Sequence, residues 1–302
     1  MSSKAEISHP STLFFEKIIN SKDSSAWFLE NRYLILYSSV VYMIIGYICR
    51  NYMKTVPPIN LRRILLLWNT AFAAICLFGA SRMASAMYYI LQKTGSEGSL
   101  CKDLHSVAPQ SAIFWVWLFV ILKSFQLADG LFSTFRKKEY ASFYSYYRMC
   151  MMVLAFYTYG LHPSEILWYA IADYVINVAV YGSYTLKSLG IRKPRSLTTA
   201  IIMAQIFRII LDFLITVKAI DLQLTGSKCN MSAGCAFFNI FLYFSFIIIF
   251  CGYFYDVLFV GNRKDRNTSV KIFLNLVDKF ILFLKTFNTL YQGEDDDELK
   301  DM

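Results

Sequence analysis

Four stretches of the chain run for 17 to 20 residues without a charged side chain, and they constrain the fold more than any other feature. An α-helix rises about 1.5 Å per residue, so about 20 apolar residues cross the hydrocarbon core of a bilayer. Runs of this length therefore predict helices that span a membrane. The four stretches are Tyr33–Cys49, Ile64–Ser81, Leu104–Leu122 and Ala236–Tyr255.

Three weaker apolar stretches lie between them, and each contains an ionisable residue, which inside a membrane marks a functional site. The hydrophobic fraction of 56% exceeds the roughly 45–50% of soluble domains. The runs are also too long and too closely spaced for the buried helices of a soluble protein. We therefore predict an all-α integral membrane protein with seven transmembrane helices. The weaker stretches are Ser142–Gly160, Ile166–Leu186 and Leu197–Ile220.

Lysine and arginine gather in alternate loops, and such loops face the cytosol in membrane proteins. This bias predicts a lumenal N-terminus and a cytosolic C-terminus. The net charge of +9 follows mainly from the topology, so we expect no nucleic-acid partner. The first loop carries Arg50, Lys54, Arg62 and Arg63, the third Arg136, Lys137 and Lys138, and the fifth Lys187, Arg192, Lys193 and Arg195.

Three segments follow from this topology. Residues 1–32 form a lumenal N-terminal segment, in which Thr12–Asn20 has the pattern of a short interfacial helix. Residues 33–261 form the seven-helix membrane domain. Residues 262–302 form a cytosolic tail, with an amphipathic helix near 270–291 that lies on the membrane or packs on the bundle, and with an acidic end.

Cysteines and one glycosylation sequon provide checks on this topology. Cys101 falls in the second loop, and Cys229 and Cys235 fall in the sixth, both on the oxidising side, so Cys101 is free to pair with either. The sequon at Asn230 lies on the same side, whereas that at Asn267 lies in the cytosol and is expected to stay bare. The remaining cysteines fall within spans, where thiols are commonly buried apolar groups. We expect no metal site.

The run from residue 123 to 148, KSFQLADGLFSTFRKKEYASFYSYYR, resembles the signature region of the ELO family, the membrane-embedded very-long-chain fatty-acid elongases. Lys123, Gln126 and Asp129 stand where the family has Lys, Glu and Asp. Arg136, Lys137 and Lys138 match its basic turn. The family then carries a histidine box of pattern H-x-x-H-H, and the three box positions align with Tyr144, Tyr147 and Arg148.

The resemblance extends over roughly residues 61–259. In the fifth span, Asp173 stands at a family asparagine, Asn177 at a histidine, and Tyr181 and Tyr184 at two tyrosines. In the sixth span, Gln205 matches one family glutamine, and Arg208 replaces a second. The resemblance implies a multi-pass protein of the endoplasmic reticulum membrane, in contact with lipid.

The resemblance also implies a reaction in which a long acyl-CoA condenses with malonyl-CoA, with loss of carbon dioxide, to give a 3-oxoacyl-CoA; both are substrates, and no resident cofactor is needed. The family uses histidines as nucleophile and base, and imidazole suits both roles at neutral pH. The three histidines of this chain, His9, His105 and His162, fall outside the expected site. A phenol with a pKa near 10 is a weak nucleophile, and arginine stays protonated.

We therefore predict an elongase relative that binds acyl-CoA or fatty acyl chains and has lost or altered its activity. An active but atypical elongase and a seven-helix receptor are the alternatives. Other elongases are candidate partners in a homo- or heterodimer. The predicted acyl-CoA-binding residues are Lys123, Gln126, Asp129, Arg136, Lys137, Lys138, Tyr181, Tyr184, Gln205 and Arg208, with Arg192 and Lys193 as additional cytosolic charges.

Charges within the spans should pair, because an unpaired charge in hydrocarbon is costly. We expect Arg148 to pair with Asp173, since a five-residue loop would make their helices antiparallel neighbours. Arg208 and Asp212 are four residues apart on one helix face and should neutralise each other.

Overall fold

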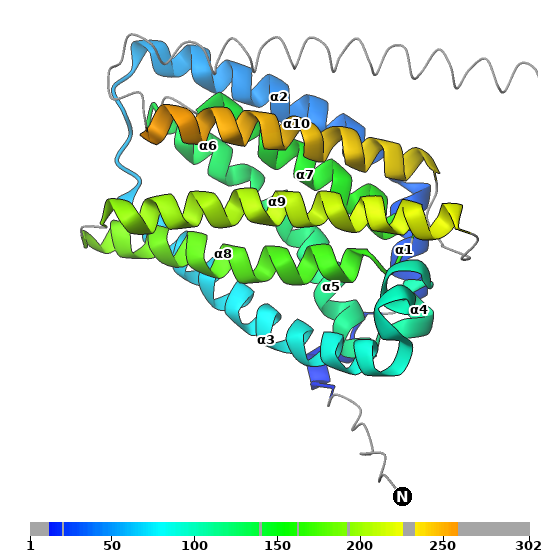
Figure 1. Cartoon of the computed structure of the whole chain (residues 1–302). Coiled ribbons are helices and arrows are strands. Elements are labelled where there is room, and N and C mark those ends of the chain that lie inside the picture. Colours follow the sequence, from blue (N-terminus) through cyan, green and yellow to red (C-terminus); the bar gives the residue numbers. More distant parts are fainter. Residues whose placement is uncertain are drawn as a thin grey trace, which may run out of the picture. The chain divides into compact units, whose positions relative to one another are not determined.

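The computed structural model describes residues 12–19, 21–138, 141–161, 163–191, 194–225 and 233–258. All regular structure in these ranges is helical, apart from an isolated antiparallel bridge between Asp103 and Pro163 (Figure 1). The elements are η1 (Phe14–Lys17), α1 (Ser21–Glu30), α2 (Arg32–Thr55), α3 (Arg62–Cys101), α4 (Leu104–Val107), α5 (Gln110–Phe125), α6 (Leu127–Phe135), α7 (Ala141–Leu161), α8 (Ile166–Leu189), α9 (Arg195–Leu224) and α10 (Ala233–Leu258).

The chain divides into two compact units. The first runs from Met1 to Tyr243 and holds every helix up to α9 together with the start of α10. The second begins at Phe244, and its described part is the remainder of α10. All side chains of the site described below belong to the first unit.

Five helices of the described residues are long and apolar enough to cross a bilayer. On α2, large apolar side chains such as Leu34, Tyr37 and Val40 are more than half exposed, as lipid-facing side chains are. The chain is therefore an all-helical, multi-pass integral membrane protein, as the sequence predicted. The five are α2, α3, the α5–α6 pair (Gln110–Phe135), α8 and α9 (Ser196–Leu224).

Two predicted boundaries are wrong. The second span was expected to end at Ser81, but α3 continues to Cys101, and its helical backbone is interrupted at Gly95, where φ is 71°. The expected end falls at Ser81 because the charged Arg82 follows it directly and interrupts the apolar run. Glu16 neutralises that charge in the structure, with the Arg82 guanidinium 2.7 Å from its carboxylate, so the helix has no reason to end there.

The third span was expected to begin at Leu104. Instead Leu104–Val107 forms a separate short helix, and Pro109 caps the start of α5. The residue before a proline is driven into extended backbone, and Ala108 accordingly has a ψ of 136°. The N-terminal segment also differs from prediction, because the interfacial helix expected over Thr12–Asn20 is only the 3₁₀ turn η1.

The core of the first unit forms mainly between α3 and α8, which pack closely along each other. Gly79 permits this approach, since a Cβ at that position would lie 2.8 Å from the Tyr174 ring. α8 also contacts α9 and α5, whereas it meets α7 at only a few residues. The short connection between α7 and α8 therefore does not make them close neighbours, contrary to expectation.

Candidate functional site

Buried charges converge on Asp173 in the middle of α8. Its carboxylate lies 2.6 Å from the Lys123 ammonium of α5 and 3.5 Å from the Arg208 guanidinium of α9. Asn177, one turn further on, donates a hydrogen bond of 2.7 Å to the second carboxylate oxygen. Arg208 also contacts Asp212 at 2.8 Å and donates to the Tyr147 hydroxyl at 2.7 Å. We call these six residues the Asp173 cluster.

A second set of polar side chains surrounds Arg148 of α7. Its guanidinium lies 3.0 Å from Asp129 and donates to the Gln126 carbonyl oxygen and the Tyr144 hydroxyl, both at 2.7 Å. The Tyr181 hydroxyl donates to Asp129 at 2.5 Å. We call Gln126, Asp129, Tyr144, Arg148 and Tyr181 the Asp129 cluster. Trp68 of α3 adds an indole N–H donor to Asp129 at 2.8 Å.

Helical spacing explains how the sequence builds both clusters. Residues four apart lie on the same helix face. Asp173, Asn177 and Tyr181 follow this spacing on α8, and Arg208 and Asp212 follow it on α9. On the α5–α6 side, Lys123, Gln126 and Asp129 recur every third residue, with Gln126 at the junction of the two helices.

The two clusters contain equal numbers of cations and carboxylates. Lys123, Arg148 and Arg208 supply three positive charges, and Asp129, Asp173 and Asp212 supply three negative ones; all six side chains are at most 9% exposed. A low-dielectric interior tolerates charges only when they are paired and hydrogen-bonded. The clusters therefore form a self-neutralised interior.

One sequence-based pairing is wrong and another is confirmed. Arg148 pairs with Asp129 rather than with Asp173, because α7 and α8 are not close neighbours and α6 places Asp129 within reach of Arg148. Arg208 and Asp212 do form the expected pair within α9.

Basic residues gather where three chain segments meet at one end of the first unit. The Ile59 N–H bonds to the Phe135 carbonyl at the end of α6, and Arg62 donates to the Ser188 carbonyl at the end of α8. Lys138 lies over the Tyr184 ring of α8, 5.9 Å from its centre. We call Arg62, Arg136, Lys137, Lys138 and Lys187 the basic rim.

Other predicted residues are placed less tightly. Gln205 is half-buried one turn before Arg208 and makes no hydrogen bond within the described residues. Arg192, Lys193, Cys229 and Asn230 lie outside the described residues, as does the side chain of Cys235. Cys101 is disulfide-bonded, whereas Cys49, Cys76, Cys150 and Cys251 are free. Which cysteine pairs with Cys101 therefore stays a prediction.

Sequence reasoning missed some residues of the site. Trp68 and Tyr42 were given no role in the site, yet Trp68 donates to Asp129 and Tyr42 donates to the Leu127 carbonyl directly beside the Asp129 cluster. Only the position of these residues on inward helix faces distinguishes them, and that signal is weak in a uniformly apolar span.

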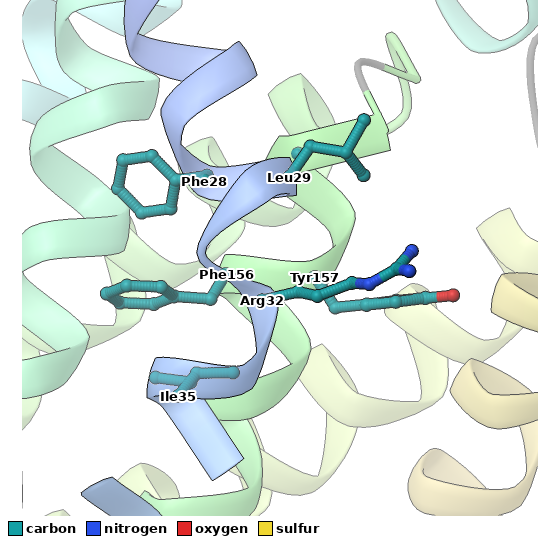
Figure 2. Close-up of a pocket in the computed structure, with 7 residues that line it drawn as sticks. Phe28, Leu29, Arg32, Ile35, Phe156 and Tyr157 are labelled. Atoms are coloured by element: carbon teal, nitrogen blue, oxygen red, sulfur yellow. The ribbon is translucent and has the colours of Figure 1, made fainter. Parts of the chain in front are cut away.

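A surface crevice shares no residue with either cluster. Figure 2 shows it where the α1–α2 junction meets α7, with the Arg32 and Tyr157 side chains overlapping in this view and the ring of Phe156 below Phe28. Its lining is mostly apolar, which is the character of a lipid-facing furrow. The lining residues are Phe28, Leu29, Arg32, Ile35, Phe156, Tyr157 and Gly160.

The helical fold and the buried polar site define a multi-pass membrane protein with an ionisable interior. Residues 27–267 match the family model "ELO: GNS1/SUR4 family", and the chain belongs to this family. It is 26% identical to very long chain fatty acid elongase 6 of Drosophila melanogaster over 261 residues, which cover 85% of this chain and 83% of that protein. It is 25% identical to the Homo sapiens protein of the same name over 255 residues, 84% of this chain and 96% of that one.

Proposed function

We propose that this protein is an elongase relative of the endoplasmic reticulum membrane that binds long-chain acyl-CoA and carries out condensation either not at all or by an altered route. Family membership supports an elongase-like role in lipid metabolism. The observation that carries the finer proposal is the engagement of Arg148 with Asp129, Gln126 and Tyr144 at a family histidine position.

The chemistry of the clusters favours binding over turnover. Condensation needs a group that accepts the acyl chain and a group that assists the carbanion step, and neutral imidazole provides a free lone pair for both. A guanidinium has five donors and no acceptor. Tyr144 and Tyr147 accept hydrogen bonds from Arg148 and Arg208, which occupies lone pairs that a nucleophile would use.

The only histidine among the described residues is His105 of α4, whose Nε2 lies 3.4 Å from the Ser25 hydroxyl. Cys150 is a buried free thiol beside Tyr146, and within the described residues it forms no hydrogen bond with either cluster. Neither residue therefore takes over the role of the histidines that the family carries at the box positions.

The basic rim is suited to the other half of the ligand. CoA carries phosphates, and clustered Lys and Arg side chains form charge-assisted hydrogen bonds with phosphate oxygens. Lys137 and Lys138 are exposed and so are available to a ligand from solvent. In this proposal the remaining acyl-CoA-binding residues lie beyond the basic rim. They are Lys123, Gln126, Asp129, Tyr181, Tyr184, Gln205 and Arg208.

We also propose seven spans, with the N-terminus in the lumen and the C-terminus in the cytosol. The Lys and Arg bias of the loops supports this topology, since it places the basic rim on the cytosolic side. Each of the seven apolar stretches falls largely within one helix, and the third (Leu104–Leu122) lies mostly within α5. Assembly with a second elongase, as a homo- or heterodimer, is part of the same proposal.

One experiment separates binding from turnover. Purified full-length protein in detergent receives labelled malonyl-CoA and acyl-CoAs of graded chain length, and both 3-oxoacyl-CoA formation and acyl-CoA retention are measured. We expect retention without product. Lys137→Gln together with Lys138→Gln should weaken retention, whereas Lys93→Gln on the distant part of α3 should not. Product formation at a rate typical of enzymes would identify the protein as an atypical active elongase instead.

A further inference from the structure

The polar face of α8 continues past the two clusters to the residue before the helix. Glu165, Tyr169, Asp173, Asn177 and Tyr181 are each four residues apart, and all are at most 6% exposed. At about 1.5 Å per residue, this stripe extends about 24 Å along the helix. Polar stripes of this kind inside membrane proteins mark ion and proton pathways.

Glu165 is the unusual member of the stripe. It is fully buried, and neither carboxylate oxygen accepts a hydrogen bond of ordinary geometry. The titratable side chains that act on it are Tyr169 on its own helix and Tyr243 on α10. Burial raises the pKa of Glu165 to about 8, with the Tyr169 hydroxyl opposing the shift, so the carboxyl carries a proton at neutral pH.

A hydroxyl pair connects this end of the stripe to the Asp173 cluster. The Tyr169 hydroxyl lies 2.7 Å from the Thr216 hydroxyl of α9, and either group is able to donate. Thr216 lies four residues after Asp212 and bonds to its backbone carbonyl at 3.0 Å. The Asp212 Oδ2 atom contacts Arg208, whereas its Oδ1 atom is buried and has no hydrogen-bond partner in the described residues.

We propose that Glu165, Tyr169, Thr216 and Asp212 form a proton relay between the loop end of α8 and the Asp173 cluster. The Glu165 O–H bond breaks and its proton passes to the Tyr169 oxygen. The Tyr169 proton passes to the Thr216 oxygen, and the Thr216 proton to Asp212 Oδ1. One proton moves in total, leaving a carboxylate at Glu165 and a carboxylic acid at Asp212, and no other reactant is needed.

The relay ends at Arg208. A guanidinium does not release a proton in a protein, so a proton that reaches Asp212 cannot continue through Arg208 towards the Asp129 cluster. The relay therefore adjusts the charge of the Asp173 cluster instead of conducting protons across the membrane. It does not depend on acyl-CoA binding, so it stands or fails separately from the proposed function.

Time-resolved infrared spectroscopy tests the relay in the purified full-length protein after a jump from alkaline to neutral pH. We expect two carboxylic-acid bands, one absent in Glu165→Gln and the other absent in Asp212→Asn. Thr216→Val removes the bridging hydroxyl with little change in shape, and it should slow the second band by about tenfold or more while sparing the first. Tyr169→Phe should act in the same way.

Thr158→Val is the matched control. The Thr158 hydroxyl of α7 is buried like that of Thr216, but it has no hydrogen-bond partner in the described residues and is not on the route, so both bands should keep their rates. An Asp212 band that appears at the wild-type rate in Thr216→Val would overturn the proposal, and so would an Asp212 that never protonates. In Glu165→Gln the second band should still appear but be slowed, because the relay has lost its donor; an unslowed second band in this variant would also overturn the proposal. If Asp212→Asn does not fold, this remaining band in Glu165→Gln still identifies the second band.

Discussion

The Lys123 ammonium lies 2.6 Å from the Asp173 carboxylate, with both side chains at most 8% exposed, and Arg208 lies 3.5 Å from the same carboxylate oxygen. Asp173 is therefore shared by two cations. Among the described residues Lys123 has no other ion pair, whereas Arg208 also pairs with Asp212 at 2.8 Å. The loss of the anion should accordingly be more harmful than the loss of either cation, because it leaves two buried positive charges side by side.

The first prediction is a double-mutant cycle on this pair. Asp173→Asn should lower the free energy of unfolding by about 3–5 kcal/mol, the usual cost of breaking a buried pair. Lys123→Met should cost less, since Asp173 keeps Arg208. The double variant should cost clearly less than the sum of the two. Thermal unfolding in detergent measures all three, and simple additivity would show that the two groups do not interact.

The second prediction concerns the geometry of Arg148. Its guanidinium reaches Gln126, Tyr144, Tyr181 and Asp129 at once, and a lysine ammonium cannot reproduce this planar set of donors. Arg148→Lys should therefore reduce stability by roughly 1–3 kcal/mol.

The exposed Arg63 provides the control for this variant, because it makes no ion pair within the described residues. Arg63→Lys should change stability by less than about 0.5 kcal/mol. Equal effects of Arg148→Lys and Arg63→Lys on the unfolding midpoint would mean that the contacts of Arg148 add nothing to the fold.

The fold class could be predicted from sequence because bilayer thickness fixes the length of an apolar helix. All seven predicted stretches fall largely in helices for this reason. The ends of the helices were less predictable. Arg82 was taken as a sign of a loop, and its buried partner Glu16 lies 66 residues away, so no local pattern could show that the charge is neutralised.

The candidate site shows the same division between local and distant contacts. The Arg208–Asp212 pair was predictable, since helical spacing alone brings the two side chains together. The partner of Arg148 was not predictable, because it depends on which helices pack against one another. The short connection between α7 and α8 favoured Asp173, but α6 packs on α7 and supplies Asp129 instead.

The third prediction concerns acid stability and the N-terminal turn η1. Burial alone would raise the pKa of Glu16, but hydrogen bonds from Arg82, the Leu13 N–H and Trp115 outweigh it and lower the pKa below 4.5. The stability that Glu16 contributes is therefore present above about pH 4.5 and is lost as the pH falls through the folded-state pKa.

Glu16→Gln should lower stability at pH 7 by about 2 kcal/mol and reduce the acid sensitivity of the unfolding midpoint. Glu30→Gln, at the exposed end of α1, is the control and should leave the fall of the unfolding midpoint at acid pH unchanged. If the unfolding midpoint falls equally at acid pH in Glu16→Gln and in the wild type, Glu16 is not the cause of the acid sensitivity.

The fourth prediction has the opposite sign and concerns Glu165. Its folded-state pKa is raised to about 8 from an ordinary value of 4.5, so the folded protein binds one proton more than the unfolded chain between these values. Stability should therefore fall as the pH rises from about 4.5 to about 8, and then level off. Glu165→Gln should remove this decline, and Glu97→Gln at an exposed site of α3 should retain it.

The fifth prediction tests the proposed topology through two sequons that lie outside the described residues. Asn230 falls in the sixth loop, which the Lys and Arg bias places in the lumen, and Asn267 falls after the seventh apolar stretch, on the cytosolic side. The glycosylation machinery acts only in the lumen, so Asn230 should be the modified site. Asn230→Gln should abolish any gel shift caused by glycosidase treatment, and Asn267→Gln should leave it intact. A shift that depends on Asn267 would place the C-terminus in the lumen and reverse the assignment of the basic rim.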